Sequence, residues 1–458
     1  MKILLIKPKM HPDNIQPSLG LGYLASNILR SGNSVKIFDL ELLKINSYQI
    51  DKILKQEEPD IVGIQCYTYG IRIVKEYLRA VKRYRESIIT VLGGPQATSA
   101  PEETLQYMSP YVDYIICGEA EEEFVKFIKS IESGNDSAEK IIRAGLIEDL
   151  NRLPFPLWEQ IDPNNYPPAP HGAFFRKLPV APIIASRGCP YNCYFCSATH
   201  ISGSKVRYRS VENIIEEIEY IVKHFGVKEI HFVDDNFTFN RNFVIDFCDK
   251  IMSKNIKLSF ACPNGVRIDT IDRELLLMMK KAGFYSLALG IESGSPQILE
   301  KINKNIQIEK VKKTVNLIRE MDMFTIGFFI IGLPFETTED IEKTIEFACS
   351  LDLTLANFML YHPLPGTVLF EKMRGEGLNK LIDYDAVSFS HSAYSHNGIG
   401  KYQLKSLQVK AFMHFYGRPK YFLQTLKFVR SLNHLVHILK RINRWLISSW
   451  FRICMYCC

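Results

Sequence analysis

Three cysteines stand close together in one short segment of the chain, SRGCPYNCYFCSATH at residues 186–200. Cys189, Cys193 and Cys196 are separated by three and by two intervening residues. Thiolates are soft ligands that favour iron–sulfur clusters or zinc. A four-iron cluster that is held by only three cysteines keeps one iron open for another ligand. The spacing therefore predicts a metal site with an open position at these cysteines.

Zinc is the competing metal for such a loop, and three thiols without any metal are a further alternative. Zinc normally takes a fourth Cys or His at short spacing, and His200 is the nearby candidate. A disulfide framework is not expected among the eleven cysteines, because the N-terminal MKILLIK lacks the features of a signal peptide and cytosolic thiols stay reduced. We therefore expect a cytoplasmic protein with a metal cluster.

Six β-branched runs alternate with helix-length segments in the second half of the chain. This alternation predicts a parallel sheet curved into a partial (β/α)6 barrel. Asp234 and Asp235 end one run, and Glu292 and Ser293 end another. Site residues of such barrels gather at the carboxyl ends of the strands, although an Asp there can also cap the next helix. Arg267 pairs either with a carboxylate of a ligand or with one at the surface.

The first part of the chain shows the same alternation and predicts a doubly wound, mostly parallel sheet. A ligand binds such a sheet where the strand ends open into a crevice. The Pro- and Asn-rich stretch NRLPFPLWEQIDPNNYPPAP follows and marks a domain boundary. The predicted fold class is thus α/β with a C-terminal helical tail. Its parts are the sheet domain at 1–140, a linker at 141–178, the partial barrel at 179–385 and a basic helical region at 386–458.

The segment CPYNCYFC, with the aromatic Phe195 just before its last cysteine, resembles the signature of radical S-adenosylmethionine enzymes. The similarity extends from about Pro182 to about Gly366. It implies a four-iron four-sulfur (4Fe-4S) cluster whose open iron chelates S-adenosylmethionine. Reductive cleavage would then give methionine and a 5′-deoxyadenosyl radical, so the cofactors carry the chemistry and the protein positions them.

The same resemblance implies roles for residues at the strand ends. One of Asp234 and Asp235 would hold the methionine ammonium of S-adenosylmethionine, and Glu292 and Ser293 would face its ribose and methionyl region. Gly332, in FIIGLPFET, would lie beside the adenine. A simple turn glycine is the structural alternative for Gly332.

Four segments of the first part, SLGLGYLA, PDIVGIQ, GGPQAT and DYIICGEAEEEF, are similar in that order to the cobalamin-binding domain that precedes the radical domain in many of these enzymes. The resemblance implies a corrin ring between the two domains. The D-x-H-x-x-G motif is absent and His11 is the only histidine before His171, so cobalt would lack a histidine ligand from this domain. A degenerate domain without cobalamin is the alternative. The residues placed at cobalamin are Ser18, Gly20, Gly93, Gly94, Gln96, Gly118 and Glu119.

With both cofactors, the resemblance implies methylation of an unactivated carbon of a small or lipid-like substrate, and hence a cobalamin-dependent C-methyltransferase. A cobalamin-dependent radical oxidative cyclase or rearrangement enzyme is the first alternative. A non-catalytic cobalamin or S-adenosylmethionine sensor is an alternative of another class. The expected partners are the substrate and an electron donor such as flavodoxin or ferredoxin, with no nucleic acid.

The C-terminal region is basic, whereas the rest of the chain is mildly acidic. Residues 401–458 contain eleven Lys or Arg and no Asp or Glu, within a chain of net charge +6. Apolar residues recur there at helical spacing, which predicts a basic amphipathic helix. Such a helix lies peripherally on anionic lipid or packs on the barrel with a solvated basic face. No apolar run is long enough to span a bilayer.

Overall fold

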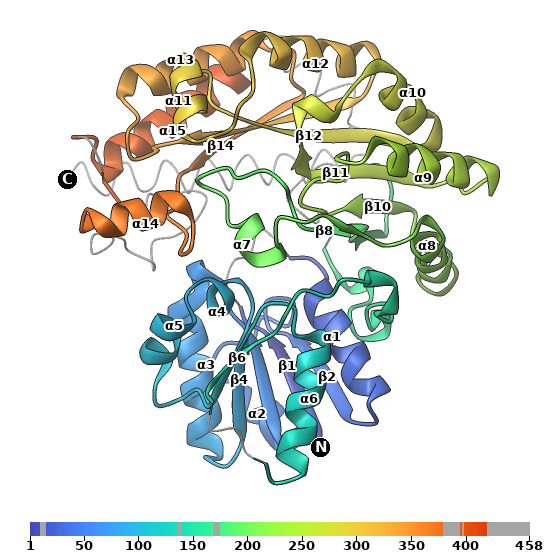
Figure 1. The fold of residues 1–458 in the computed structure, drawn as a ribbon, viewed down its shortest axis with the longest axis vertical. Helices are drawn as coiled ribbons and strands as arrows, with labels where there is room; N and C mark the ends of the chain where they lie inside the picture. The colour runs from blue at the N-terminus through green and yellow to red at the C-terminus, as the bar shows by residue number, and fades with distance from the viewer. Residues whose placement is uncertain (10–14, 136–138, 168–174, 379–393, 396–397, 419–458) are drawn as a thin grey trace.

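The computed structural model describes residues 1–9, 15–135, 139–167, 175–378, 394–395 and 398–418. Two parallel sheets, one from each half of the chain, are arranged one above the other along the long axis of the molecule (Figure 1). The predicted α/β fold class is confirmed. The two halves meet at the carboxyl ends of their strands, where both sheets direct their loops toward each other (Figure 1).

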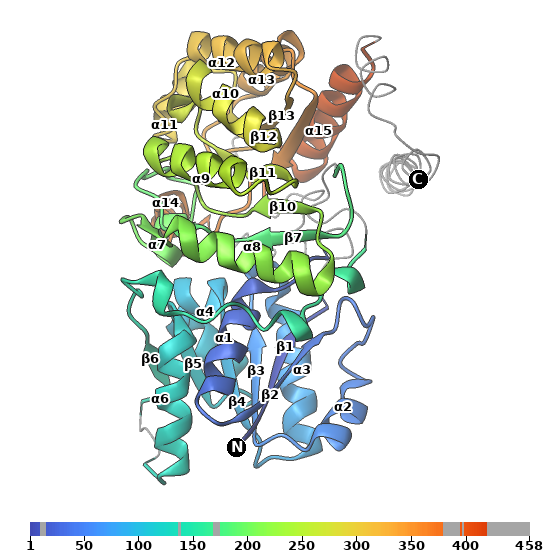
Figure 2. The same cartoon turned by 90° about the vertical axis from the view of Figure 1, so that its right-hand side faces the viewer.

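The first sheet has six strands in the order β2-β1-β3-β4-β5-β6, all of them parallel. The strand order reverses at β1, so a crevice opens between the ends of β1 and β3. Helices α1 and α6 cover one face, and α2 and α3 cover the other (Figure 2). The strands are β1 (Lys2–Lys7), β2 (Ser34–Asp39), β3 (Ile61–Gln65), β4 (Ile89–Gly93), β5 (Tyr114–Cys117) and β6 (Ile141–Arg143), and the helices are α1 (Leu19–Arg30), α2 (Ile50–Glu57), α3 (Ile71–Tyr84), α4 (Pro95–Ser99), α5 (Pro101–Met108) and α6 (Ala120–Glu132).

The second sheet has six parallel strands in the order β14-β13-β12-β11-β10-β7. Its edge strands β7 and β14 are not neighbours within the described residues, so the barrel is open. The strands are β7 (Val180–Ile183), β10 (Glu229–Phe232), β11 (Ser259–Val266), β12 (Phe284–Glu292), β13 (Phe324–Ile331) and β14 (Leu355–Leu360). The helices are α7 (Ala198–Ser202), α8 (Val211–Phe225), α9 (Arg241–Ser253), α10 (Arg273–Ala282), α11 (Pro296–Lys301), α12 (Ile308–Glu320), α13 (Thr338–Ser350) and α14 (Val368–Gly375).

Stacked aromatic rings fill the space between the barrel strands and their outer helices. Phe260 lies 5.1 Å from Phe284 and 6.1 Å from Phe232, measured between ring centroids. All three rings are at most 2% exposed. Burying a phenyl ring contributes roughly 1.5–3 kcal/mol, so this cluster holds α9 and α10 against the sheet and fixes the strand ends above it.

The segment between the two halves is packed rather than extended. Trp158 is fully buried there, and its Nε1 donates to Glu217 of α8 at 2.9 Å. Strand β6 begins at Ile141, so the last strand of the first sheet lies inside the range 141–178 that we predict as the linker. The four domain boundaries themselves stay predictions.

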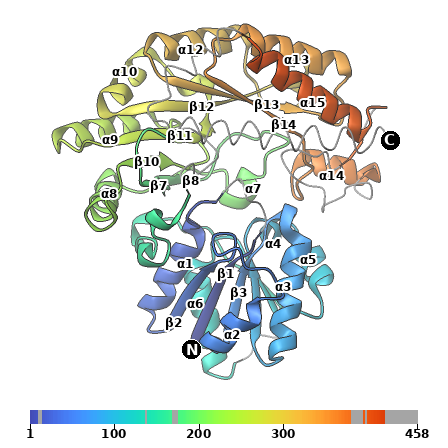
Figure 3. The ribbon, with the colours of Figure 1, turned by 180° about the vertical axis from the view of Figure 1, so that it is seen from behind.

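The last described helix is α15 (Lys401–Tyr416), which lies beside β14 and α13 (Figure 3). Gln408 donates to the Phe358 carbonyl at 2.7 Å, and the Tyr416 hydroxyl donates to the Ala356 carbonyl at 2.8 Å. The amphipathic helix predicted after it falls on residues 419–458, outside the described ranges. No helix in the described ranges is both long and apolar enough to cross a bilayer.

Candidate functional site

The cysteine loop connects the two strands of a short antiparallel hairpin, β8 (Ser186–Arg187) and β9 (Arg207–Tyr208), and begins directly after β8. Gly188 has φ +102°, and a side chain at this position would collide with the Lys205 carbonyl oxygen. Only glycine tolerates both conditions. The Cys189 amide donates to the Gly203 carbonyl at 3.0 Å, so the hairpin fixes where the loop starts.

Contacts from later segments hold the middle of the loop. The Tyr194 amide donates to the Ile302 carbonyl at 3.0 Å, and the Tyr194 carbonyl accepts from the Leu369 amide at 3.0 Å. Asn303 donates to the Asn192 carbonyl at 2.6 Å. The half-buried Phe195 ring packs against the barrel core. The loop is therefore built by three parts of the barrel rather than by its own residues alone.

All three thiols of the loop are free, and Cys196 is exposed as a whole residue while the other two are half-buried. The Cys196 sulfur itself is enclosed by neighbouring groups, and this burial raises its pKa to about 12, to which the charges of Cys193, Asp235 and Cys189 add. The Ala198 amide donates to the Cys196 sulfur at 3.5 Å. Three mutually close soft donors, one of them accepting an N–H bond, fit the ligand set of an iron–sulfur cluster.

A single metal ion would need its ligands to converge on one point. No three His, Cys, Asp or Glu side chains within the described ranges are gathered closely enough to hold one ion. The thiolates of a four-iron cube bind three different irons, so that geometry is not required for a cluster. His200, the candidate fourth ligand for zinc, has its ring against Gly366, where an added Cβ would lie 2.8 Å from the ring.

Asp234 and Asp235 follow β10 but have different surroundings. Asp234 is buried and accepts from the Ala185 and Ser186 amides and from the Ser186 hydroxyl at 2.7 Å, and burial raises its pKa to about 6. Asp235 accepts from the Gly188 amide at 3.2 Å and is exposed. Neither caps the next helix, because α9 is capped by the side chain of Asn240. Asp235 is thus the better placed of the two to bind a ligand.

Glu292 ends β12 in a strained backbone conformation, with φ +68°. Its carboxylate pairs with the Lys304 ammonium at 2.8 Å, and both side chains are only 8% exposed. A Cβ at Gly290 would lie 2.7 Å from this carboxylate and 2.8 Å from the Lys304 ammonium, so the pair packs directly against the β12 backbone. Strained residues that persist in a buried ion pair are typical of binding sites. Ser293, in contrast, is fully buried, and its hydroxyl bonds to Thr344 at 3.0 Å.

Gly332 follows β13 with φ +89° and lies in a closed network. Its amide donates to Glu336 at 2.6 Å, and its carbonyl accepts from the Tyr394 hydroxyl at 2.6 Å. Burial raises the pKa of Glu336 to about 8. The other carboxyl oxygen of Glu336 has no hydrogen-bond partner among the residues that the structure describes. The sequence motif FIIGLPFET contains Glu336, but its role in holding the Gly332 loop was not predicted.

The titration of Glu336 gives a pH prediction. The pKa of Glu336 in the folded protein lies above its ordinary value, so the folded state keeps a proton that the unfolded state has lost. The free energy of unfolding therefore falls as the pH rises toward about 8. Between about pH 6.5 and about pH 8.5, wild-type protein should lose about 2 kcal/mol of unfolding free energy relative to E336Q, which has no proton to release. Urea unfolding across this range measures it. Parallel pH curves for the two proteins would contradict the assignment.

A cavity of about 290 Å³ lies between the two halves. From the first sheet it is lined at the ends of β4 and β5, and from the barrel by Asp234 and Asp235. A second cavity of about 300 Å³ adjoins it near the ends of β1 and β3. Among the residues predicted at cobalamin, the first cavity is lined by Gly20, Gly93, Gly94, Gly118 and Glu119, and the second by Ser18 and Gly20.

Gln96 lies apart from the other residues predicted at cobalamin. Its side chain is buried, donates to the Thr104 hydroxyl at 3.1 Å and lines neither cavity. The glycines at the ends of β4 and β5, unlike Gln96, line the first cavity. Gly94 has φ +97°, and a Cβ there would lie 2.9 Å from the Cys66 carbonyl oxygen. The packing of the strand ends thus requires glycine at this position, and the glycines line the cavity together with apolar walls such as Phe124 and Ile184.

Gly118 gives a direct test of this part of the cavity. It has φ +83°, and a Cβ there would lie 2.5 Å from the Ala144 carbonyl oxygen. G118A should therefore cost about 3 kcal/mol of unfolding free energy and reduce the cobalamin that the purified protein retains. Gly134 is the matched control, since it has φ +72° with nothing within 4 Å, and G134A should cost about 1 kcal/mol without loss of cobalamin. Equal effects of the two variants would contradict a special role for Gly118.

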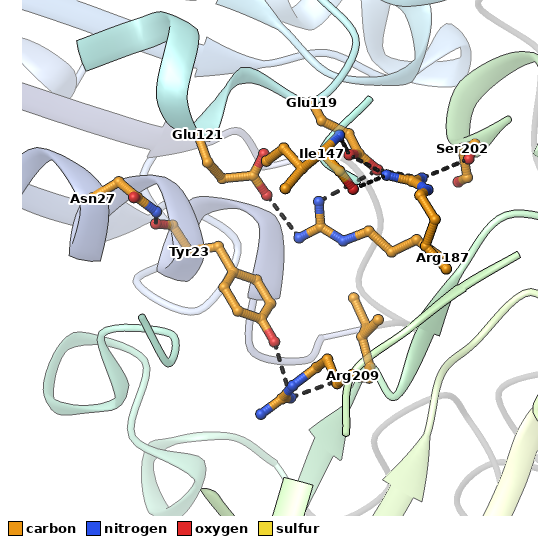
Figure 4. A network of polar contacts seen from close by, with 10 residues as sticks. Tyr23, Asn27, Glu119, Glu121, Ile147, Arg187, Ser202 and Arg209 are labelled. Atoms are coloured by element: carbon orange, nitrogen blue, oxygen red, sulfur yellow. Dashed lines mark hydrogen bonds and ion pairs between the residues drawn. The ribbon is translucent and has the colours of Figure 1, made fainter. Parts of the chain in front are cut away.

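Buried ion pairs join the two halves beside the first cavity. Arg207 of β9 forms a bidentate pair with Glu119 at 2.6 and 2.8 Å. Arg187 of β8 pairs with Glu121 at 2.7 Å (Figure 4). Burial acts to raise the pKa of Glu119, but the hydrogen bond from Arg207 and the charge of Arg187 outweigh it and hold the pKa below its usual value. Glu119 is therefore occupied by an arginine while it lines the cavity.

A third arginine, Arg209, connects the barrel to helix α1 of the first half. Arg209 donates to the Tyr23 hydroxyl at 3.3 Å (Figure 4), and it also pairs with Glu217. Glu217 also accepts from Trp158. These arginines have no local sequence pattern that marks them, because Arg207 and Glu119 are 88 positions apart. Sequence analysis missed Arg187, Arg207 and Arg209 for this reason, and it also missed Lys304 and Glu336.

Comparisons with known proteins agree with this geometry. Residues 183–348 match the Radical SAM superfamily and residues 11–128 match the B12 binding domain. A protein named uncharacterized methyltransferase PH0819, from Pyrococcus horikoshii, is 31% identical over 471 residues, which cover 99% of each chain. The anaerobic magnesium-protoporphyrin IX monomethyl ester cyclase of Cereibacter sphaeroides is 28% identical over 85% of this chain and 66% of its own.

The fold is shared with a solved structure of similar architecture. OxsB, a cobalamin-dependent S-adenosylmethionine radical enzyme solved with aqua-cobalamin and S-adenosylmethionine, matches with a TM-score of 0.71 at 17% identity, over 98% of this chain and 72% of its own. Fold, paired domains and a full-length relative therefore agree, and the chain belongs to the cobalamin-binding radical S-adenosylmethionine enzymes, whose cofactors are a 4Fe-4S cluster, S-adenosylmethionine and cobalamin.

Proposed function

We propose that this protein is a methyltransferase that places a methyl group on an unactivated carbon of a small or lipid-like substrate. The observation that carries the proposal is the cavity between the halves, which is lined by the glycine ends of the first sheet and by the strand ends beside the cysteine loop. A substrate held there would reach both cofactor regions at once. Small-molecule sites commonly lie at such domain interfaces.

The chain's own residues have distinct tasks in this proposal. Cys189, Cys193 and Cys196 would hold the cluster, while Asp235 and Glu292 would bind polar groups of S-adenosylmethionine. When bound, the cofactors supply one-electron bond cleavage and the methyl group. The apolar walls at Ile184, Ile201 and Val233 would exclude water from a reactive radical. Gly93, Gly94 and Gly118 would let cobalamin approach the backbone.

Methyl transfer is favoured over oxidative cyclisation by the extent of the similarities. The relative that matches over 99% of both chains bears a methyltransferase name, whereas the cyclase relative matches 66% of its own length. An oxidative cyclase remains the second candidate, because its relatives match 85% of this chain. A sensor has no use for an intact three-cysteine loop beside an open strand-end cavity.

The deciding experiment is anaerobic reconstitution with iron, sulfide and cobalamin, followed by incubation with S-adenosylmethionine, a reductant and small-molecule or lipid extracts. Methyl transfer predicts 5′-deoxyadenosine, S-adenosylhomocysteine and a product heavier by one CH2 group. Cyclisation predicts 5′-deoxyadenosine with a product that has lost hydrogen. Reconstituted protein that retains cobalamin but forms no 5′-deoxyadenosine would contradict both.

Two partners complete the proposal, a one-electron donor of the flavodoxin or ferredoxin type and an anionic lipid surface that meets the basic C-terminal region. The full chain should float with anionic vesicles, whereas a chain ending at Arg418, after the packed helix α15, should not. Neutral vesicles are the control. Equal flotation of the two chains would remove the membrane from the proposal.

A further inference from the structure

Arg187 attaches the start of the cysteine loop to the first half of the protein. It stands two positions before Cys189. Its guanidinium donates to Glu121 at 2.7 Å (Figure 4) and lies 3.5 Å from Glu119. The same guanidinium stands over the Tyr23 ring of α1, 5.2 Å from the ring centre. The arginine side chain is 13% exposed and both glutamate side chains are 8% exposed, so water screens these contacts little.

The end of the cysteine loop is attached to the same part of the first half. Helix α7 follows Cys196 and ends at Ser202, whose carbonyl accepts from Arg207 at 2.8 Å. Arg207 also forms the bidentate pair with Glu119, at the start of α6. Arg187 and Arg207 lie opposite each other in the β8–β9 hairpin. One pair of arginines therefore holds both ends of the loop against the start of α6.

The groups that these arginines contact are also walls of the first cavity. Tyr23, Glu119 and Glu121 line this cavity from the first half, and Arg187 and Ser202 line it from the barrel. The same side chains thus shape the cavity on one side and hold the cysteine loop on the other. A change in the position of Arg187 reaches both sites.

Two ligands that restrain the same groups affect each other's binding. Iron bound at Cys189 would restrain the backbone beside Arg187, and a ligand in the first cavity would restrain Glu119, Glu121 and Tyr23. The ordering that one ligand has completed is not repeated for the next, so the second ligand binds more tightly. This effect on affinity is reciprocal, because it is one coupling free energy between two sites.

We propose that Arg187 is a positioning residue through which cluster assembly in the cysteine loop and cobalamin binding in the first cavity strengthen each other. The inference goes beyond methyl transfer because it concerns binding alone. It rests on the assignment of Cys189 to the cluster and of the first cavity to cobalamin. Arg187 acts through Glu119, Glu121 and Tyr23 and does not ligate iron. Protein that has assembled its cluster therefore binds cobalamin more tightly than protein that has not.

Equilibrium dialysis measures this coupling without turnover. Aquacobalamin is dialysed anaerobically against iron-free protein and against protein reconstituted with the 4Fe-4S cluster, both without S-adenosylmethionine. Free cobalamin is measured in the protein-free chamber, where the cluster does not absorb. The wild type should bind cobalamin about tenfold more tightly with its cluster than without it, which is an ordinary size for coupling between two sites.

Variants of the ion pair test whether Arg187 carries the coupling. R187M removes the charge but keeps an unbranched side chain, so the ratio of the two affinities should fall to about twofold or less. E121Q removes the partner's charge with little change of shape and should lower the ratio similarly. The double variant should lower it no further, because both changes break one interaction. R152M is the matched control, since it removes an exposed arginine 4.0 Å from Glu122 on the same helix and should keep the tenfold ratio of about the wild type.

The ratio of the two affinities separates positioning from a merely structural role. R187M that binds cobalamin more weakly in both forms but keeps the wild-type ratio would overturn the proposal, as would equal affinities of the two wild-type forms. If R187M does not fold, E121Q decides, because a lowered ratio supports the coupling and an unchanged ratio overturns it. The product assay is separate, so the expected ratios support the inference even in a protein that forms no methylated product.

Discussion

C193A is expected to lower the formation of 5′-deoxyadenosine by at least about a thousandfold, because a cluster with two remaining protein ligands cannot deliver the electron. The variant should retain less iron and lose the EPR signal of the reduced cluster. Iron analysis, EPR and chromatographic detection of 5′-deoxyadenosine after incubation with dithionite measure these effects. The fold should persist, since Cys193 is only half-buried and lies outside the hydrophobic core.

C349A is the matched control for C193A. Cys349 is also half-buried and free, but it lies on α13, away from the loop. C349A should bind iron and form 5′-deoxyadenosine as the wild type does. A C193A protein with full iron content and wild-type 5′-deoxyadenosine would refute the cluster assignment, and equal losses in both variants would indicate general thiol damage.

R207L is expected to destabilise the protein by about 3–5 kcal/mol, the usual cost of leaving one partner of a buried ion pair alone. Glu119 is 8% exposed and would lose both bonds of its bidentate pair. The carbonyls of Ile147 and Ser202 would also lose a donor. Because Glu119 lines the first cavity, cobalamin retention should fall with stability. Urea unfolding and absorbance of retained cobalamin measure the two effects.

Two further variants isolate the ion pair from other effects of R207L. K205M removes an exposed pair with Glu148 from the same hairpin and should not measurably change stability. Adding E119Q to R207L removes the buried charge and should restore about 2 kcal/mol. An R207L protein that unfolds like the wild type would show that the pair carries no net stability.

Local patterns in the sequence predicted most of the architecture. The alternation of β-branched runs with helical segments has a period that can be counted, and both parallel sheets follow from it. The cysteine loop was predictable because its spacing is local and its chemistry is specific. The glycines of the first sheet were found through resemblance, and the structure adds the physical reason at Gly94 and Gly118, which have positive φ.

Contacts between distant residues were not predictable in this way. Asp234 and Asp235 look equivalent in the sequence, yet consecutive side chains at a strand end point to opposite sides, so Asp234 is buried against the Ala185 and Ser186 amides, whereas Asp235 is exposed and accepts from the Gly188 amide. The Glu292–Lys304 pair depends on how the segment after α11 folds back onto β12, and Arg187 and Arg207 of the β8–β9 hairpin depend on how the two halves meet. Gln96 follows the cavity glycines in sequence, but its side chain bonds to Thr104 instead.

The β8–β9 hairpin limits how this barrel can be recombined with other proteins. Its Arg187 and Arg207 are neutralised by Glu121 and Glu119 of the first domain, whereas Arg209, just after β9, pairs with Glu217 of the barrel's own helix α8. A chimera that grafts the barrel onto a foreign first domain would bury Arg187 and Arg207 against an uncharged surface, at a cost of several kcal/mol for each unpaired ion. Exchange of either half succeeds only if the hairpin arginines and the glutamates that pair with them are transferred together.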